Sequence, residues 1–97
     1  MPKGYLLAEF EVIDPAEFEH YRARIAEVSG TFGGRYLVRR SEPVVLDGAW
    51  SPKRVVLIEF SSPEQCRAFY DSPEYRAILP HRLRSTEGHV LLLTGAE

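Results

Sequence analysis

Residues 55–60, which read Val-Val-Leu-Ile-Glu-Phe, decide the fold of this chain. A strand with one face in water alternates apolar and polar residues. This stretch is instead apolar at both parities and carries a single carboxylate, Glu59. Both faces of the strand are therefore expected to be covered by other parts of the structure.

The bulk composition is that of one globular domain over residues 1–97, with 44% hydrophobic and 27% charged residues. A net charge of −2 argues against a general electrostatic hold on nucleic acid or on an anionic membrane. The single cysteine, Cys66, excludes an internal disulfide. The apolar run at residues 5–8 is far shorter than the roughly 20 residues of a membrane span. We therefore expect a cytoplasmic protein.

Cap signals and apolar spacing locate the elements. Asp14-Pro15 and Ser62-Pro63 each place a capping side chain before a proline at the first helical position. Pro80 is expected to end or kink the last helix. In chain order we predict a strand over 4–13, a helix from 15 to about 30, strands over 35–40 and 55–60, a short helix from 63, a helix from 73 to about 80, and a strand over 88–94.

The segment between the second and third strands contains Asp47-Gly48, a strong hairpin signal after the apolar Val44-Val45-Leu46. Pro43 and Pro52 cannot donate to a strand ladder, so the turn does not fix the register.

The two halves of the chain resemble each other. Glu9-Phe10 followed by Asp14-Pro15 is matched by Glu59-Phe60 followed by Ser62-Pro63. The order strand, helix, strand, strand, helix, strand predicts an α+β, ferredoxin-like split βαβ fold with a four-stranded antiparallel sheet. In this fold the first and third strands are central, and the right-handed crossover places the helices on one face.

That topology divides the central strands into two faces. We expect the helices to cover the side chains of Leu6, Ala8, Phe10, Val12, Val56, Ile58 and Phe60. The other face holds Tyr5, Leu7, Glu9, Val55, Leu57 and Glu59, and no helix remains to cover it. Exposing its large aliphatic residues would forfeit on the order of 1.5–3 kcal/mol each, which predicts a homodimer with sheets packed face to face. An inverted assignment, with the carboxylates beneath the helices next to a cavity, stays open.

Four motifs in this order carry a family resemblance: residues 33–39 (Gly-Gly-Arg-Tyr-Leu-Val-Arg), Trp50 with Pro52, residues 55–60, and residues 70–75 (Tyr-Asp-Ser-Pro-Glu-Tyr). The chain resembles domain-of-unknown-function family 1330 over nearly its whole length. The resemblance implies a dimeric α+β barrel of ferredoxin-like protomers. It also implies a superfamily that includes monooxygenases, muconolactone isomerases and stress-responsive dimers, and it implies no settled reaction. The sequence departs from the family at Arg40-Ser41, where a glycine or another small residue is more common.

The residues indicate neither a metal nor a bound cofactor. Three scattered histidines and one cysteine lack ligand spacing. Gly33-Gly34 is not followed by the further glycines and the helix of a nucleotide-binding loop. The remaining chemistry lies in polar residues on apolar strands, because a carboxylate near another carboxylate or in an apolar wall acquires a raised pKa suited to proton transfer.

Our leading hypothesis is a small pocket between sheet and helices that handles a small organic molecule. Glu59 would act as general base or acid and Arg39 would hold an anion. His20 would serve as a wall or proton donor. The candidate ligand-binding residues are Tyr36, Trp50, Glu9, His81 and Arg82.

Structural interpretations stand beside these roles. Glu9 and Glu59 suit solvated strand ends or pairing across a dimer, and Trp50 suits a packing anchor. His20 suits a solvated helix surface, and His81-Arg82 suits an exposed basic turn. The competing functions are a non-catalytic ligand-binding module and a purely structural dimer.

Overall fold

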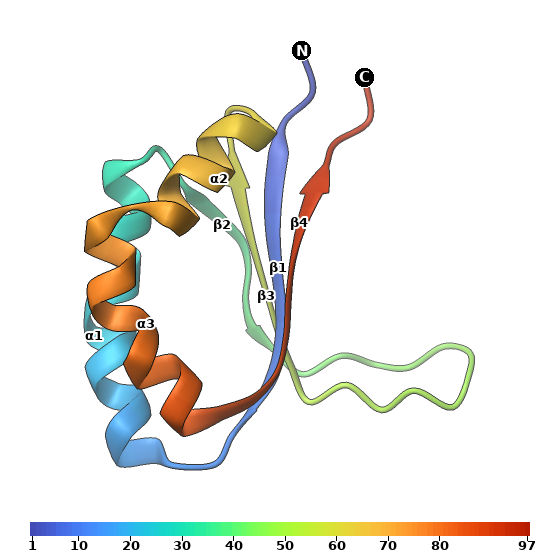
Figure 1. Ribbon diagram of the computed structural model, residues 1–97. Coiled ribbons are helices and arrows are strands. Elements are labelled where there is room, and N and C mark those ends of the chain that lie inside the picture. The colour runs from blue at the N-terminus through green and yellow to red at the C-terminus, as the bar shows by residue number, and fades with distance from the viewer.

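Three helices cover one face of a four-stranded antiparallel sheet in the computed structural model, which describes residues 1–97 (Figure 1). The strand order β2-β3-β1-β4 confirms the ferredoxin-like prediction, with β1 and β3 in the centre. The elements are β1 (Gly4–Val12), α1 (Pro15–Thr31), β2 (Arg35–Ser41), β3 (Arg54–Phe60), α2 (Pro63–Asp71), α3 (Pro73–Ser85) and β4 (Thr86–Thr94).

The helices begin where the cap signals predict. Asp14 accepts a hydrogen bond from the backbone N–H of Glu17 at 3.2 Å, and Ser62 accepts one from Gln65 at 3.0 Å. Each cap satisfies a backbone donor that the first helical turn leaves unpaired. None of the helices has the length and apolar composition needed to span a membrane.

The core lies between the sheet and the helices. The face of the sheet that the helices cover is the one predicted from the alternation of residues in the central strands. Leu6, Phe10, Ile58 and Phe60 are buried beneath the helices, so the inverted assignment is wrong. The helices contribute mainly aromatic and branched residues to the same core: Phe18, Tyr21, Ile25, Val28, Phe69, Tyr75, Ile78 and Leu79.

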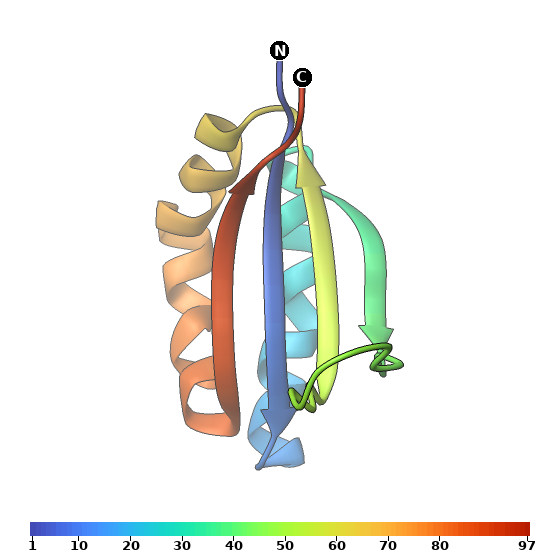
Figure 2. The ribbon, with the colours of Figure 1, turned by 90° about the vertical axis from the view of Figure 1, so that its right-hand side faces the viewer.

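The opposite face of the sheet has no cover within the chain (Figure 2). The strand registers pair Leu7 with Leu57 on one side and with Leu91 on the other, so three leucines form a row across this open face. Leu91 is exposed, and Leu7 and Leu57 are half-buried.

Two boundaries differ from the sequence-based expectation. Helix α3 does not end at Pro80 but continues through it to Ser85, and β4 begins directly afterwards at Thr86. Proline prevents one helical hydrogen bond, yet the neighbouring turns of α3 are held by packing against α1. His81 and Arg82 therefore lie on a helix rather than in a turn.

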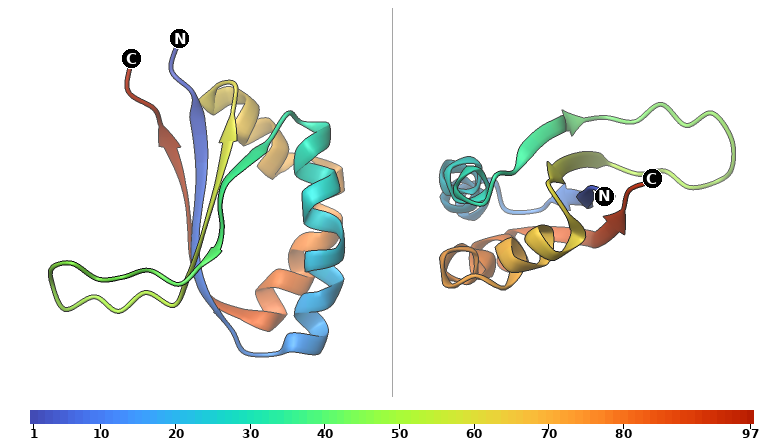
Figure 3. Two further views of the ribbon diagram at one scale, coloured as in Figure 1. Left: turned by 180° about the vertical axis from the view of Figure 1, so that it is seen from behind. Right: turned by 90° about the horizontal axis from the view of Figure 1, so that it is seen from above.

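The Asp47-Gly48 signal does not produce a two-residue hairpin. Residues 42–53 form one long loop that leaves the sheet on its open side, and we call this loop the arm (Figures 1 and 3). Leu46 and Trp50 on the arm are 94% and 66% exposed, so no packing holds Val44-Val45-Leu46 in a strand.

Strand β2 contains a local distortion close to the arm. Its register against β3 shifts between Val38 and Ser41, and Arg40 has a left-handed backbone with φ of 55°. A left-handed residue other than glycine costs about 1–2 kcal/mol. The departure from the family pattern noted above falls at this position.

Candidate ligand-binding site

A cavity of about 60 Å³ lies between the sheet and the helices. All four strands, α1 and α3 contribute to its walls. Most of the lining is apolar, and the aromatic residues Phe10, Phe18, Tyr21, Tyr36 and Tyr75 make up much of it. Arg22, Arg39 and Arg40 line it and are exposed, so the cavity is reachable from solvent on their side.

The charged groups around this cavity are all of one sign. Its lining contains four arginines and no aspartate or glutamate. Arg22 is neutralised by Glu19, to which it donates two hydrogen bonds of 2.6 Å. Arg39, Arg40 and Arg82 form no ion pair with any carboxylate of the chain. The cavity therefore carries a positive charge that the protein does not compensate.

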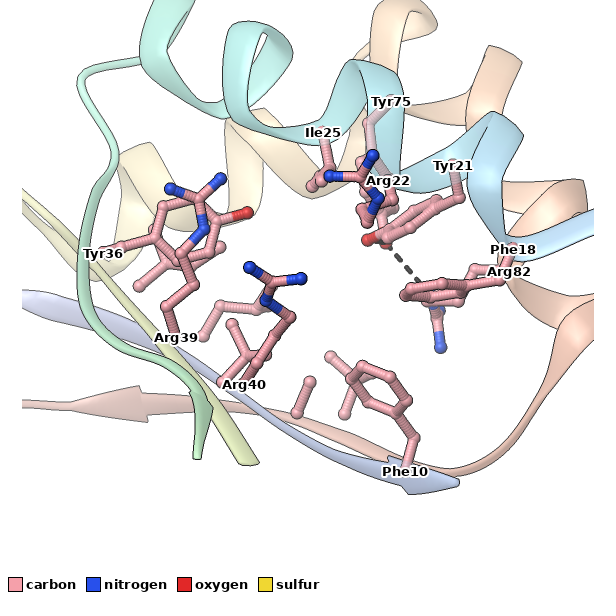
Figure 4. A pocket seen from close by; sticks show the side chains of 15 residues that line it. Phe10, Phe18, Tyr21, Arg22, Ile25, Tyr36, Arg39, Arg40, Tyr75 and Arg82 are labelled. Atoms are coloured by element: carbon pink, nitrogen blue, oxygen red, sulfur yellow. Dashed lines mark hydrogen bonds between the residues drawn. The ribbon is translucent and has the colours of Figure 1, made fainter. Parts of the chain in front are cut away.

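Arg82 is the least exposed of these arginines, at 8%, and lies on the α3 side of the cavity (Figure 4). Its Nε donates to the hydroxyl of Tyr75 at 3.2 Å, and its Nη2 donates to the hydroxyl of Tyr70 at 3.3 Å. Its Nη1 has no hydrogen-bond partner in the protein. A buried cation ordinarily has an anionic partner, so Arg82 marks a place where an external anion would be stabilised.

Two buried phenols extend this polar group. The hydroxyls of Tyr21 and Tyr75 lie 2.9 Å apart, and both side chains line the cavity. Burial raises the pKa of Tyr21 well above that of a free phenol, and the proximity of Tyr75 adds to the effect. Burial also raises the pKa of Tyr75, although Arg82 opposes that shift. Both phenols therefore stay protonated at neutral pH, and because one of them donates to the other, one phenol proton is left to donate to a ligand.

Three of the residues proposed from sequence meet at this cavity: Tyr36, Arg39 and Arg82. Arg39 stacks over the Tyr36 ring, with its guanidinium carbon 4.5 Å from the ring centroid. Figure 4 shows Arg39 and Arg40 on the β2 side of the cavity and Arg82 on the α3 side. The expectation of an exposed basic turn is wrong for Arg82, because the last turns of α3 bring its side chain inward.

The two strand glutamates lie elsewhere. Glu59 is on the open face, where it accepts hydrogen bonds from Tyr5 and Arg35, each at 3.2 Å. Glu9 is also on that face and accepts from the backbone N–H of Lys53 at 3.1 Å. The register pairs Glu59 with Tyr5, four residues from Glu9, which places the glutamates about 13 Å apart along the strands. The expected close carboxylate pair is therefore absent, and a catalytic role for Glu59 would need a second site on the open face.

The remaining candidates also lie outside the cavity lining. His20 and His81 face each other near the start of α1 and the end of α3, with ring centroids 5.3 Å apart. His81 contacts Glu17 through its Nδ1 at 2.6 Å. Trp50 is exposed on the arm.

Sequence reasoning missed Tyr21, Tyr75 and Arg40 as cavity residues. The two tyrosines were assigned to the apolar faces of the predicted helices. Nothing in the sequence indicated that their hydroxyls lie together in a cavity. The spacing of Tyr75, Ile78, Leu79 and Arg82 is that of one continuous helical face, and it would have placed Arg82 inside had the helix been extended past Pro80. The structure holds no group of three or more His, Cys, Asp and Glu residues able to bind a metal.

Comparison with known proteins identifies the family of this chain. Residues 3–96 match the family described as Domain of unknown function (DUF1330). The chain belongs to this family. No curated protein matches the sequence.

Solved structures resemble this DUF1330 chain in fold. RPA0582, a protein of unknown function from Rhodopseudomonas palustris, is 15% identical with a TM-score of 0.76, over 99% of this chain and 84% of that one. SnoaB, a cofactor-independent oxygenase from Streptomyces nogalater, is 17% identical with a TM-score of 0.69, over 100% and 96%. A dimeric ferredoxin-like protein of unknown function from Thermobifida fusca is 14% identical with a TM-score of 0.61, over 99% and 92%. At these identities the likeness concerns the fold.

Proposed function

We propose that the cavity between sheet and helices binds a small organic anion with an apolar body. The observation that carries this proposal is Arg82, a largely buried residue at the cavity wall whose guanidinium has no carboxylate partner and whose Nη1 remains accessible. The free Nη1 of Arg82, together with the one phenol proton that the hydrogen bond between Tyr21 and Tyr75 leaves free, would donate hydrogen bonds to the anionic group. The apolar lining would hold the rest of the molecule.

The cavity in its present form is narrower than most ligand pockets, which measure 300–1,000 Å³. Arg39 and Arg40 are exposed on its β2 side, so rotation of these side chains can widen the entrance without disturbing the core. A short chain or a single ring therefore suits this site better than a large cofactor.

Calorimetric titration with octanoate and with 1-octanol tests the proposal. The two probes share an apolar chain and differ in charge. We expect the wild type to bind octanoate at least tenfold more tightly than octanol, because a hydrogen bond to a charged group contributes about 1.5–3 kcal/mol. Arg82→Met should remove this preference, whereas Arg24→Met, which removes an exposed arginine on α1, should retain it. Equal affinity of the wild type for both probes would contradict the proposal.

A cofactor-independent enzyme of the oxygenase or isomerase type is a second candidate. It is favoured by the two protonated phenols next to Arg82, which could stabilise a developing oxyanion. The similarity in fold to SnoaB, a cofactor-independent oxygenase, also supports this candidate. The cavity itself provides no carboxylate or histidine as a general base, so we rank binding above catalysis. Glu59 keeps its proposed role only if the reaction takes place on the open face of the sheet, whereas Arg39 lines the cavity and keeps its proposed role of holding an anion.

Deuterium exchange at the carbon next to a ketone, followed by NMR with acetylacetone as probe, tests this second candidate. An enzyme should accelerate the exchange over the buffer rate. Tyr21→Phe and Glu59→Gln would then show whether the phenol on the cavity side or the carboxylate on the open face is responsible. Exchange at the buffer rate with wild-type protein would leave binding as the function.

We also propose that the chain forms a homodimer through the open face of the sheet. The uncovered leucine row on β1, β3 and β4 supports this, as do neighbouring structures described as dimeric ferredoxin-like proteins. The arm projects from the same side of the sheet and carries exposed apolar residues, so it would extend the contact surface (Figure 1). Sedimentation velocity at micromolar concentration should show a dimer.

A further inference from the structure

The cavity carries a second, separate positive charge at the β2 distortion. Val38 pairs with Leu57 and Ser41 pairs with Val55, so two residues of β2 oppose a single residue of β3. This is the geometry of a β-bulge. The two residues of β2 at this bulge are Arg39 and Arg40.

The bulge changes the direction of one arginine side chain. In a regular strand, consecutive residues point to opposite faces of the sheet, so Arg39 and Arg40 would not share a cavity. With φ of 55° at Arg40, both side chains line it. Arg40 is the one residue other than glycine with a positive φ in this chain. A strained backbone of this kind persists where the surrounding structure imposes it, and such residues cluster at ligand sites.

Neither bulge arginine has a carboxylate partner, although most arginines of the chain do. The charge of Arg39 lies over the Tyr36 ring, and that of Arg40 points in among the side chains that line the cavity (Figure 4). Arg82 stands across the cavity on α3, with apolar side chains of the sheet between the two positions. The cavity thus has arginines without carboxylate partners at two places, Arg82 and the Arg39–Arg40 bulge, and an apolar lining between them.

We propose that the ligand is an elongated organic dianion, such as a dicarboxylate, with one anionic group at Arg82 and the other at the Arg39–Arg40 bulge. This inference rests on the proposed function, since it requires that Arg82 bind an anion, and it adds the class of ligand. The bulge would select against a monoanion of equal length, because its two charges would then remain unpaired. Arg40 would be a residue that determines specificity.

Calorimetric titration with two pairs of probes, adipate against hexanoate and suberate against octanoate, tests this class of ligand. Each pair has the same chain length and differs by one carboxylate. In the wild type we expect the better-fitting dicarboxylate to bind at least tenfold more tightly than its monocarboxylate. In Arg40→Gly this ratio should fall toward one, and the melting temperature should rise, because glycine adopts the φ of residue 40 without strain.

Two further variants serve as controls. Arg40→Lys retains a charge at the bulge and should keep most of the preference for the dianion. Arg54→Gln lowers the net charge equally at a residue outside the cavity lining, and it should keep the wild-type ratio. If octanoate itself fails to bind preferentially over octanol, the proposed function is wrong. If octanoate binds but suberate and adipate gain nothing, or if Arg54→Gln lowers the ratio as much as Arg40→Gly, the inference about the dianion is overturned while the proposed function stands.

Discussion

Arg82 and Tyr75 form a polar contact inside an otherwise apolar layer. Tyr75 is 1% exposed, and its hydroxyl joins the Nε of Arg82 to the hydroxyl of Tyr21. If Tyr75 accepts from Arg82 and donates to Tyr21, the proton of Tyr21 is free to point into the cavity. Through this chain of hydrogen bonds the charge of Arg82 polarises the Tyr21 hydroxyl, which can contact the ligand.

Removing the Tyr75 hydroxyl tests how much this contact stabilises the fold. Tyr75→Phe keeps the ring but leaves the Tyr21 hydroxyl and the Arg82 Nε without their partner, and an unsatisfied buried polar group costs about 1–3 kcal/mol. We expect a loss of about 2 kcal/mol in the free energy of unfolding, which for a domain of this size is roughly 10 °C in melting temperature. Thermal unfolding followed by circular dichroism measures it.

Tyr70→Phe is the matched control for this prediction. The Tyr70 hydroxyl is half-buried and makes a single, longer bond of 3.3 Å to Arg82. Its loss should lower the melting temperature by only a few degrees. Equal effects of the two substitutions would contradict the central place given to Tyr75.

For single residues, the sequence predicted which face of the sheet a side chain lies on better than which groups it contacts. The alternation of β1 and β3 placed Phe10, Ile58 and Phe60 in the core, because period-two patterns report directly on the two faces of a sheet. It misplaced Arg82, because the expected end of the helix at Pro80 cut that residue off from the apolar face of α3. It also gave Arg40 no special weight, because a bulge depends on the register between two strands.

Helices α1 and α3 are joined at one end by a charged cluster. The carboxylate of Glu17 on α1 accepts from His81 at 2.6 Å and from Arg84 at 2.7 Å, both on α3. The hydrogen bonds from His81 and then from Arg84 hold the pKa of Glu17 below its usual value. The cluster lies beside the cavity wall formed by Phe18 and Arg82, so it helps to fix the spacing of the two helices.

This cluster predicts a specific loss of stability in acid. Because the pKa of Glu17 is lower in the folded than in the unfolded chain, its contribution is complete above the unfolded value of about 4.3 and disappears as the pH falls through the folded value. Melting temperatures from pH 7 to pH 3 should therefore fall more steeply for the wild type than for Glu17→Gln. Glu27→Gln alters an exposed carboxylate of the same helix whose nearest arginine is 3.7 Å away, and it should follow the wild-type curve. Parallel curves for all three proteins would contradict the prediction.

The elements themselves were largely predictable, and the exceptions have local physical causes. Proline caps and apolar stripes located the starts of all three helices. The end of α3 was misplaced because tertiary packing outweighs the loss of one hydrogen bond at Pro80. The hairpin expected at Asp47-Gly48 fails because Val44 and Leu46 have no surface in the protomer on which to pair or pack.

At the scale of the whole molecule, the protomer is a two-layer slab with one bare side. Its Cα atoms span 34 × 34 × 16 Å, and the arm stands off the bare side of the sheet. Small domains bury a smaller fraction of their surface than large ones. A second copy on the open face would cover the leucine row and both strand glutamates in a single contact.

A lysine at the β3 position of that row should therefore prevent association without unfolding the protomer. Leu57 is half-buried between Leu7 and Val38, and in a dimer Leu57→Lys would have to bury an unpaired charge. We expect the dissociation constant of the dimer to rise on the order of a hundredfold, from 3 kcal/mol or so of lost association energy. Sedimentation velocity should then show a monomer, and the circular dichroism spectrum should be unchanged.

The control is Leu83→Lys, at an exposed leucine on α3, which should remain dimeric. A monomeric wild type, or a Leu57→Lys protein that associates as strongly as the wild type, would mean that the open face serves something other than a second copy. The exposed leucines and the arm would then point to a different protein partner.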